Sequence, residues 1–316
     1  MYTRAMDNYT NQTVFDTDGR PYHLQREVGK GAQGVVYEDD SGDYMIKLAS
    51  ATNPAHRAEM KRRYRWLLNR QIATDARLIV PLALLAPPHV GYVMERVRGH
   101  IPLTRLLVPD SDTNFGIWYN EATGGLRRRL ILGAILARGF TALQADGLSY
   151  SDLSDTNILV ARDATVLSIC LIDPETLSVS GSAEALVLGT PGYIAPELMH
   201  KTHAPDALSD NFSLAVILFR LLRIGHPFLG DVVQEASPEV EEQALSGACP
   251  YIDHPDDASN RSTSVLPSEH VCTTRLADLF RQAFVDGAAE RACRPTPQQW
   301  EEACWFAVGN TLRCES

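Results

Sequence analysis

Short, β-type patterns of apolar and polar residues occupy the first third of the chain. Residues 22–38 and 43–48 contain alternating or β-rich runs around turn residues, which predicts a hairpin sheet. Residues 53–72 have a helical pattern instead, and residues 78–86 and 90–97 predict two further strands. This part of the chain therefore predicts a small sheet with one main helix.

After residue 99 the pattern becomes mostly helical. Residues 126–145, 210–224 and 276–284 carry long helical patterns, whereas residues 231–272 are rich in Pro, Ser, Asp and Glu and predict a long surface insertion. Residues 1–20 are polar, and we expect them to be loosely ordered. The expected fold class is α+β, with a β-rich lobe, a larger helical lobe and a joint near Met94 to Val97.

Composition excludes several classes of protein. The formal charge of −10 argues against a nucleic-acid-binding surface, which is normally basic. The longest apolar tracts are interrupted by prolines or arginines, so no membrane span is expected. The six cysteines include no C-x-x-C pair and the first residues show no export signal, which favours a reduced, cytoplasmic protein.

Three polar residues carry the candidate chemistry. Asp152 lies five positions before Asn157, and Asp173 ends the next apolar run. Phosphoryl transfer needs one carboxylate beside the incoming hydroxyl, together with an amide and a second carboxylate that hold magnesium against the phosphates. The spacing therefore indicates a phosphotransferase.

A glycine-rich segment lies between two predicted strands. Gly29, Gly31 and Gly34 would let the backbone fold closely over phosphates. A dinucleotide-binding fold is the rival interpretation, but it needs a helix directly after the glycines. A further strand and a hairpin follow here, so the rival is disfavoured.

Lys47 ends the strand after this segment, where its amine could neutralise phosphate oxygens, although a surface lysine at a strand end is the alternative. It needs an acidic partner, and the helical segment that follows offers only Glu59. Glu59 borders an apolar stripe that includes Met60 and Tyr64, so it could face inward. The alternative is an i,i+4 pair with Arg63.

With these motifs in this order, the chain resembles a eukaryotic-type (Hanks-type) protein kinase over roughly residues 22–306. Residues 92–97 resemble the hinge that receives adenine, and residues 189–197 resemble the end of the activation segment. Asp210 resembles the aspartate that ties its helix to the catalytic loop. Arg294 resembles the arginine that pairs with the glutamate of the A-P-E motif, here Glu197.

The resemblance implies the bilobal kinase fold, with ATP and Mg²⁺ as cofactors and a protein Ser/Thr hydroxyl as substrate. Asp152 would be the base, Asn157 and Asp173 would hold Mg²⁺, Lys47 would contact the α- and β-phosphates, and Glu59 would fix Lys47. The implied nucleotide-binding residues are Val28, Gly29, Gly31, Gly34, Val36, Lys47, Met94, Glu95 and Val97. The implied domains are an N-terminal extension (1–21), the N-lobe (22–95), the C-lobe (96–308, with the insertion 231–272) and a tail (309–316).

Several residues depart from the family pattern. Ser151 replaces the arginine before the base, which predicts activity that does not require phosphorylation of the activation segment. Ser154 replaces a lysine near the γ-phosphate. Pro174 and Glu175 follow Asp173 in place of phenylalanine and glycine; Glu175 is either a further carboxylate near the metals or, as we favour, a solvent-facing residue.

Base, amide, metal carboxylate, lysine and glycines all remain, so catalysis is favoured over a nucleotide-binding pseudokinase scaffold. Thr190 is expected to reach Asp152, which favours Ser/Thr over Tyr as the acceptor. The motifs also resemble a bacterial subfamily associated with a metal-dependent protein phosphatase and a von Willebrand A-type domain protein. That resemblance implies a signalling role with such partners.

Overall fold

The structure, a computed structural model, describes residues 9–31, 33–50, 53–70, 72, 76–109, 112–182 and 189–311. The chain forms two compact units. The first comprises residues 1–72, 78–98 and 172–175, and the second comprises residues 73–77, 99–171 and 176–316. The short segment 172–175 thus joins the first unit, although the sequence suggested a single division near residue 95.

The first unit is built on an antiparallel sheet whose strand order is β1-β2-β3-β4-β7-β6. The strands are β1 (Thr13–Phe15), β2 (Pro21–Gly31), β3 (Gly34–Asp39), β4 (Tyr44–Ala49), β6 (Ala83–Leu84) and β7 (Gly91–Glu95). The predicted hairpin strands are present. The strand predicted over residues 78–86 is shorter in the structure, where only Ala83–Leu84 of that range lies in this sheet.

The pairing register places side chains of different kinds on the two faces of this sheet. Val36 pairs with Lys47, and Lys47 pairs with Tyr92. Because side chains alternate along each strand, these three residues share one face. Their neighbours Val35 and Ile46 point to the other face, into a buried apolar cluster that also contains Tyr22, Tyr37 and Val93.

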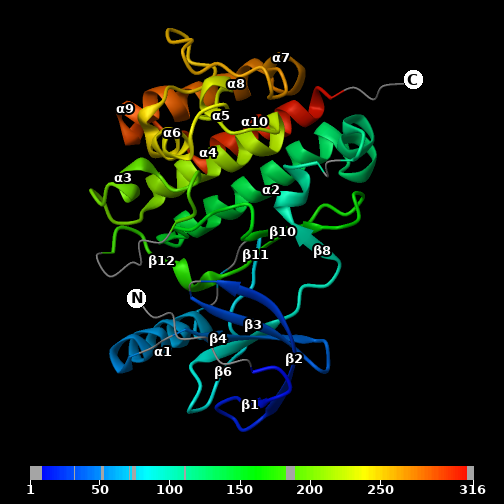
Figure 1. The fold of residues 1–316 in the computed structure, drawn as a ribbon, viewed down its shortest axis with the longest axis vertical. Coiled ribbons are helices and arrows are strands. Elements are labelled where there is room, and N and C mark those ends of the chain that lie inside the picture. The colour runs from blue at the N-terminus through cyan, green and yellow to red at the C-terminus, as the bar shows by residue number, and fades with distance from the viewer. Residues whose placement is uncertain are drawn as a thin grey trace. The chain divides into compact units, whose positions relative to one another are not determined.

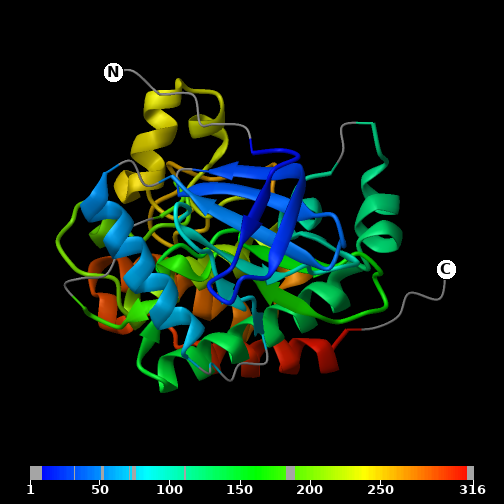
Figure 2. The ribbon, with the colours of Figure 1, turned by 90° about the horizontal axis from the view of Figure 1, so that it is seen from below.

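Helix α1 (Pro54–Leu68) packs beside β6 and β7 (Figure 2). It begins after Asn53, whose side chain accepts from the backbone N–H of His56, and Pro54 suits the first turn. Its inward face carries the residues Met60, Arg63, Tyr64 and Leu67. Their spacing is that of a single helical face.

The second unit is mainly helical (Figure 1). Its helices are α2 (Gly125–Ala145), α3 (Pro196–Met199), α4 (Ala207–Arg223), α5 (Asp231–Gln234), α6 (Pro238–Gln243), α7 (Ser268–Val271), α8 (Thr274–Arg281), α9 (Gly287–Ala289) and α10 (Pro297–Gly309). Helix α2 packs against both α4 and α10. The rings of Phe219, Phe280 and Trp300 meet in the core, with ring centres 5.2 Å and 4.8 Å apart along the series.

Short strands and single turns complete the described chain. The strands are β5 (Arg77–Leu78), β8 (His100–Pro102), β9 (Leu148–Ser149), β10 (Ile158–Ala161), β11 (Ile169–Leu171) and β12 (Ser178–Val179). β10 pairs antiparallel with β8 and β11, and β9 pairs with β12. The 3₁₀ turns are η1 (Leu103–Leu106), η3 (Pro174–Thr176) and η6 (Arg291–Cys293), and the π-type turns are η2 (Ile117–Ala122), η4 (Ala244–Ala248) and η5 (Gln282–Asp286).

Two expectations about irregular segments are wrong. Residues 13–15 are not loosely ordered, because β1 pairs with β2 and buries Val14. The segment 231–272 is not simply a surface loop, because it contains short helices and the buried residues Tyr251, Ile252 and Asn260. The Asn260 amide donates to the Phe228 and Pro250 carbonyls at 2.9 and 2.7 Å, which ties the segment to itself and to the residues before it.

Residues 1–8 of the expected extension and 312–316 of the expected tail lie outside the described residues. No helix within the described ranges is long and apolar enough to cross a membrane.

Candidate active site

Lys47 lies in the first unit on β4, with its side chain only 5% exposed. Its ammonium nitrogen lies 2.9 Å from Asp173 Oδ1 and 2.7 Å from Glu175 Oε1. A buried ammonium is stable only when it is paired. The two carboxylates provide that pairing and fix the direction in which Lys47 points.

Burial lowers the pKa of Lys47, but the charges of Glu175 and Asp173 oppose it, and the net effect raises the pKa. Lys47 is therefore a permanent cation. Burial raises the pKa of the Glu175 carboxyl, and the Lys47 charge opposes this shift without cancelling it. Burial, followed by the Glu175 and Asp173 charges, also raises the pKa of the hydroxyls of Tyr64 and Tyr92, whose ring centres are 4.9 Å apart.

Glu59 does not hold Lys47, so the sequence-based assignment is wrong. Its carboxylate accepts from Arg62 Nε and Nη2 at 3.1 and 3.2 Å, and its side chain is 40% exposed. The physical reason is the phase of α1: the inward face is centred on Met60 and Tyr64, and Glu59 lies about 100° around the helix from Met60.

Glu175, in contrast, is fully buried, so the expected solvent-facing position is also wrong. Arg63, on the inward face of α1, donates from Nε to the Glu175 backbone carbonyl. The sequence offered Arg63 only as a possible partner of Glu59.

The glycine-rich segment connects β2 and β3. Gly31 pairs with Gly34, and Gly29 pairs with Val36. A Cβ on Gly34 would lie 2.3 Å from the Leu48 carbonyl oxygen, so packing within the sheet explains that glycine. A Cβ on Gly29 or Gly31 would meet no described atom within 4 Å.

The remaining expected nucleotide contacts lie on strands of the same unit. Val28 of β2 is 48% exposed, and Val36 of β3 is half-buried. Met94 is buried within β7, Glu95 ends the strand exposed, and Val97 follows half-buried.

Asp152 lies in the second unit, in the turn before β10. Asn157 donates from Nδ2 to the Asp152 carbonyl oxygen at 2.9 Å and to Asp152 Oδ2 at 3.3 Å. The Thr190 hydroxyl donates to Asp152 Oδ1 at 2.9 Å, which confirms the predicted contact. The Asp152 carboxylate is therefore oriented from two directions.

The backbone before Asp152 is held by Asp210 of α4. Asp210 accepts from the Tyr150 N–H at 2.7 Å and from the Ser151 N–H at 3.0 Å, as the sequence predicted. Burial raises the pKa of Asp210 to about 7, although the two N–H groups lower it. Ser151 adopts a positive φ of 54°, and its hydroxyl donates to the Thr176 carbonyl at 2.8 Å.

Ser154 is fully buried and lies 3.0 Å from the Thr156 hydroxyl, oxygen to oxygen. Position 154 therefore carries no lysine. The guanidinium of Arg220, from α4, lies 3.6 Å from the carboxylate of the next residue, Asp155. No sequence pattern predicted the pair of Arg220 and Asp155.

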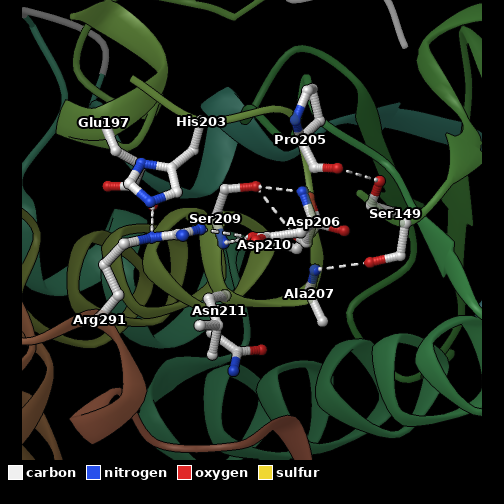
Figure 3. A network of polar contacts seen from close by, with 12 residues as sticks. Ser149, Glu197, His203, Pro205, Asp206, Ala207, Ser209, Asp210, Asn211 and Arg291 are labelled. Atoms are coloured by element: carbon white, nitrogen blue, oxygen red, sulfur yellow. Dashed lines mark hydrogen bonds and ion pairs between the residues drawn. The ribbon is translucent and has the colours of Figure 1, made fainter. Parts of the chain in front are cut away.

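Glu197 and its arginines form a network in the second unit. Arg294 binds Glu197 through two contacts of 2.6 and 2.8 Å, confirming the predicted pair. Arg291, which the sequence did not single out, lies 2.8 Å from Glu197 and 2.6 Å from Asp206. Asp206 also caps α4 by accepting from the Ser209 N–H at 2.9 Å; Figure 3 shows Arg291, Asp206 and Ser209 in this network.

Comparison with known proteins identifies the family. The model of the protein kinase domain matches residues 22–306. The chain belongs to the protein kinase domain family. The protein kinase YegI of Escherichia coli K12 is 24% identical over 317 residues, covering 93% of this chain and 46% of that protein, so the chain spans less than half its length.

Two further relatives are named serine/threonine-protein kinases. The DNA damage-responsive serine/threonine-protein kinase RqkA of Deinococcus radiodurans is 30% identical over 66% of this chain and 31% of its own length. The serine/threonine-protein kinase PknH of Mycobacterium tuberculosis H37Rv is 27% identical over 67% of this chain and 33% of its own length.

The oxygen donors of this kinase domain have the chemistry that Mg²⁺ prefers. Asp173 retains a carboxylate whose side chain is 37% exposed, and Asn157 has an amide oxygen besides the nitrogen that binds Asp152. Among the described residues, no three His, Cys, Asp or Glu side chains gather as a complete metal site. A carboxylate together with substrate phosphates and water is the usual ligand set of Mg²⁺.

Proposed function

We propose that this kinase domain is an ATP·Mg²⁺-dependent serine/threonine protein kinase. The observation that supports it best is the orientation of Asp152, whose carboxylate is bound by both Asn157 and Thr190. A carboxylate held in this way suits a base that accepts the proton of an incoming hydroxyl. Thr190 is itself a hydroxyl side chain at this carboxylate, which favours Ser/Thr acceptors.

The proposed roles of the other groups follow from their chemistry. Lys47, held as a cation, would contact the α- and β-phosphates, and Asp173 and Asn157 would ligate Mg²⁺. A side chain at Gly29 or Gly31 would meet no described atom, so packing within the described chain does not explain these glycines. A ligand that approaches the backbone closely at these positions would explain them. Val28, Gly34, Val36, Met94, Glu95 and Val97 complete the proposed nucleotide-binding set. When bound, the magnesium ion would neutralise the charge that develops on the phosphates.

We also propose that activity does not depend on phosphorylation of the activation segment. Ser151 stands where an arginine could pair with a phosphate, and its hydroxyl instead donates to the Thr176 carbonyl. Asp152 is thus positioned by neutral hydrogen bonds and by Asp210, neither of which needs a phosphate group. Phosphorylation of the activation segment would then be a product of the activity rather than its switch.

The second candidate function is a nucleotide-binding pseudokinase scaffold that acts by docking partners. The absence of cationic side chains at positions 151 and 154 favours it, because such charges stabilise the transferring phosphoryl group. The intact set of base, amide, lysine and metal carboxylate favours the enzyme.

Transfer of labelled phosphate from ATP·Mg²⁺ to the protein itself and to a general protein substrate separates the two functions. We expect the wild type to transfer phosphate and Asp152→Asn, which preserves shape, to lose most of that transfer. Absence of transfer in the wild type, with ATP still raising the melting temperature, would support the scaffold. Equal transfer by Asp152→Asn would refute the assigned base.

We propose two protein partners, a metal-dependent phosphatase and a von Willebrand A-type domain protein, from the resemblance of sequence motifs. The motifs Leu171-Ile-Asp173-Pro-Glu175 and Arg294-Pro-Thr-Pro resemble the bacterial subfamily associated with a metal-dependent phosphatase and a von Willebrand A-type domain protein. Co-purification of either protein with this chain from its native host would support that association.

A further inference from the structure

We propose that Glu175, rather than a carboxylate of α1, is the positioning residue that holds Lys47 for the phosphates of ATP, and that α1 is bound to the same segment through Arg63. The inference rests on the proposed function and concerns residues of the first unit alone.

The first argument is the burial of Glu175. Its side chain is 0% exposed, and its carboxylate lies 2.7 Å from the Lys47 nitrogen. Removing a carboxylate from water is strongly unfavourable unless an opposite charge offsets it. Lys47 supplies that charge, so the two groups determine each other's position.

The second argument is the geometry of the segment that carries Glu175. Asp173 has a positive φ of 58°, and the ring of Pro174 fixes φ at the first residue of the turn η3. The backbone therefore leaves little freedom between the two carboxylates. Both reach the same ammonium group from positions two residues apart, Asp173 at 2.9 Å and Glu175 at 2.7 Å.

The third argument is the reversed polarity of the contact with α1. Glu59 of α1 binds Arg62 and is 40% exposed, so α1 offers Lys47 no carboxylate from this position. One turn further along, Arg63 is 9% exposed and donates to the Glu175 carbonyl oxygen. The helix thus contributes a cation to the backbone of residue 175, and the side chain of residue 175 contributes the anion to Lys47.

These contacts predict that the orientation of Lys47 is set within residues 173–175. A change in the side chain at position 59 should leave it intact. A change at position 175 should impair the use of ATP more than the binding of the protein substrate, because Lys47 is proposed to contact only the nucleotide.

The test compares Glu175→Gln, Glu175→Asp and Glu59→Gln in steady-state phosphate transfer, with ATP and the protein substrate varied separately. We expect Glu175→Gln to lower kcat/KM for ATP by about 100-fold, as misplacement of a positioned group does, while KM for the protein substrate is unchanged. Glu175→Asp keeps the charge and should retain more activity than Glu175→Gln. Glu59→Gln should remain within about threefold of the wild type, as expected for an exposed pair.

A merely structural role would lower kcat/KM for ATP and for the protein substrate to the same extent, or lower the active fraction, and that result would overturn the inference. So would unchanged kcat/KM in Glu175→Gln, a loss in Glu59→Gln as large as that in Glu175→Gln, or no advantage of aspartate over glutamine at position 175.

A nucleotide-binding arm separates failure of this inference from failure of the proposed function. If the wild type transfers no phosphate but ATP·Mg²⁺ raises its melting temperature, the proposed enzyme is refuted and the inference is still tested. Loss of the ATP-induced rise in Glu175→Gln, with the rise retained in Glu59→Gln, would then support it. Retention of the rise in Glu175→Gln, or no rise in the wild type, would overturn it.

Discussion

His226 makes a contribution to stability that depends on pH and can be isolated by one substitution. Its ring is buried in the second unit, where Nε2 lies 2.8 Å from the Gly192 carbonyl oxygen and Nδ1 accepts from the Phe228 N–H at 3.2 Å. The neutral ring, with its proton on Nε2, satisfies both contacts. A second proton would have to displace the Phe228 N–H.

The magnitude follows from the pKa. Burial lowers the pKa of His226 from 6.5 to about 4, and the Arg220 charge lowers it further against the Gly192 contact. At about 1.4 kcal/mol per pH unit, this difference corresponds to about 3 kcal/mol. Because the folded-state pKa is the lower one, this stability is fully present above about pH 6.5 and is lost as the pH falls to about 4.

The assay is urea unfolding of the wild type and of His226→Gln at several pH values between 4 and 8. Asp210 acts in the opposite sense: its pKa is raised from 3.8 to about 7, so its contribution is present at low pH and is lost as the pH rises through 7. Both proteins contain Asp210, so its contribution cancels in the difference between their unfolding free energies. It would not cancel in the unfolding free energy of either protein alone.

We expect the difference in unfolding free energy to shrink by about 3 kcal/mol on acidification from pH 7 to pH 4. His203→Gln, at an exposed histidine, is the matched control. A pH-independent difference between wild type and His226→Gln would refute the reasoning.

Other substitutions test the remaining contacts. Arg294→Gln should lower the unfolding free energy by about 3–5 kcal/mol, because it leaves the buried Glu197 carboxylate without its two-point partner. Arg291→Gln, at a partly exposed arginine, should cost only about 2 kcal/mol in the same urea titration, and equal losses would contradict this ranking. The wild type should gain stability relative to Asp210→Asn as the pH falls from 7 to about 4, and a difference that does not change with pH would place the titration elsewhere. Phosphatase-treated wild type should keep its transfer rate, and loss of activity that returns on rephosphorylation would refute independence from activation-segment phosphorylation.

The sequence predicted most of the fold because its motifs follow one another in a fixed order. The glycines lie between two strands, and Asp210 and Arg294 lie at positions where the structure confirms their contacts. The resemblance to the kinase family implied both contacts, because the family's motifs specify which residues meet.

The partner of Lys47 could not be predicted in the same way, because Glu175 lies far from Lys47 along the chain and the helical segment after Lys47 offered only Glu59. The sequence favoured Glu59 by analogy, although the stripe of Met60 and Tyr64 already placed Glu59 about 120° from its centre. For Glu175 no periodic pattern existed, since it occupies a single turn. Only the structure shows that Glu175 is buried, and its ion pair with Lys47 explains why.

Arg291 was missed for a related reason. It lies in a single 3₁₀ turn, and its partners Glu197 and Asp206 are 94 and 85 residues away in the chain. A surface arginine and a bridging arginine look alike in such a turn. The burial of Asn260 could not be predicted either, because the polar composition of the segment 231–272 indicated an exposed loop.

The most direct test of the central claim is transfer of labelled phosphate from ATP·Mg²⁺ to a protein substrate, followed by identification of the phosphorylated amino acid. The account predicts phosphoserine or phosphothreonine from the wild type and almost none from Asp152→Asn. Phosphotyrosine as the main product, or equal labelling by Asp152→Asn, would contradict it.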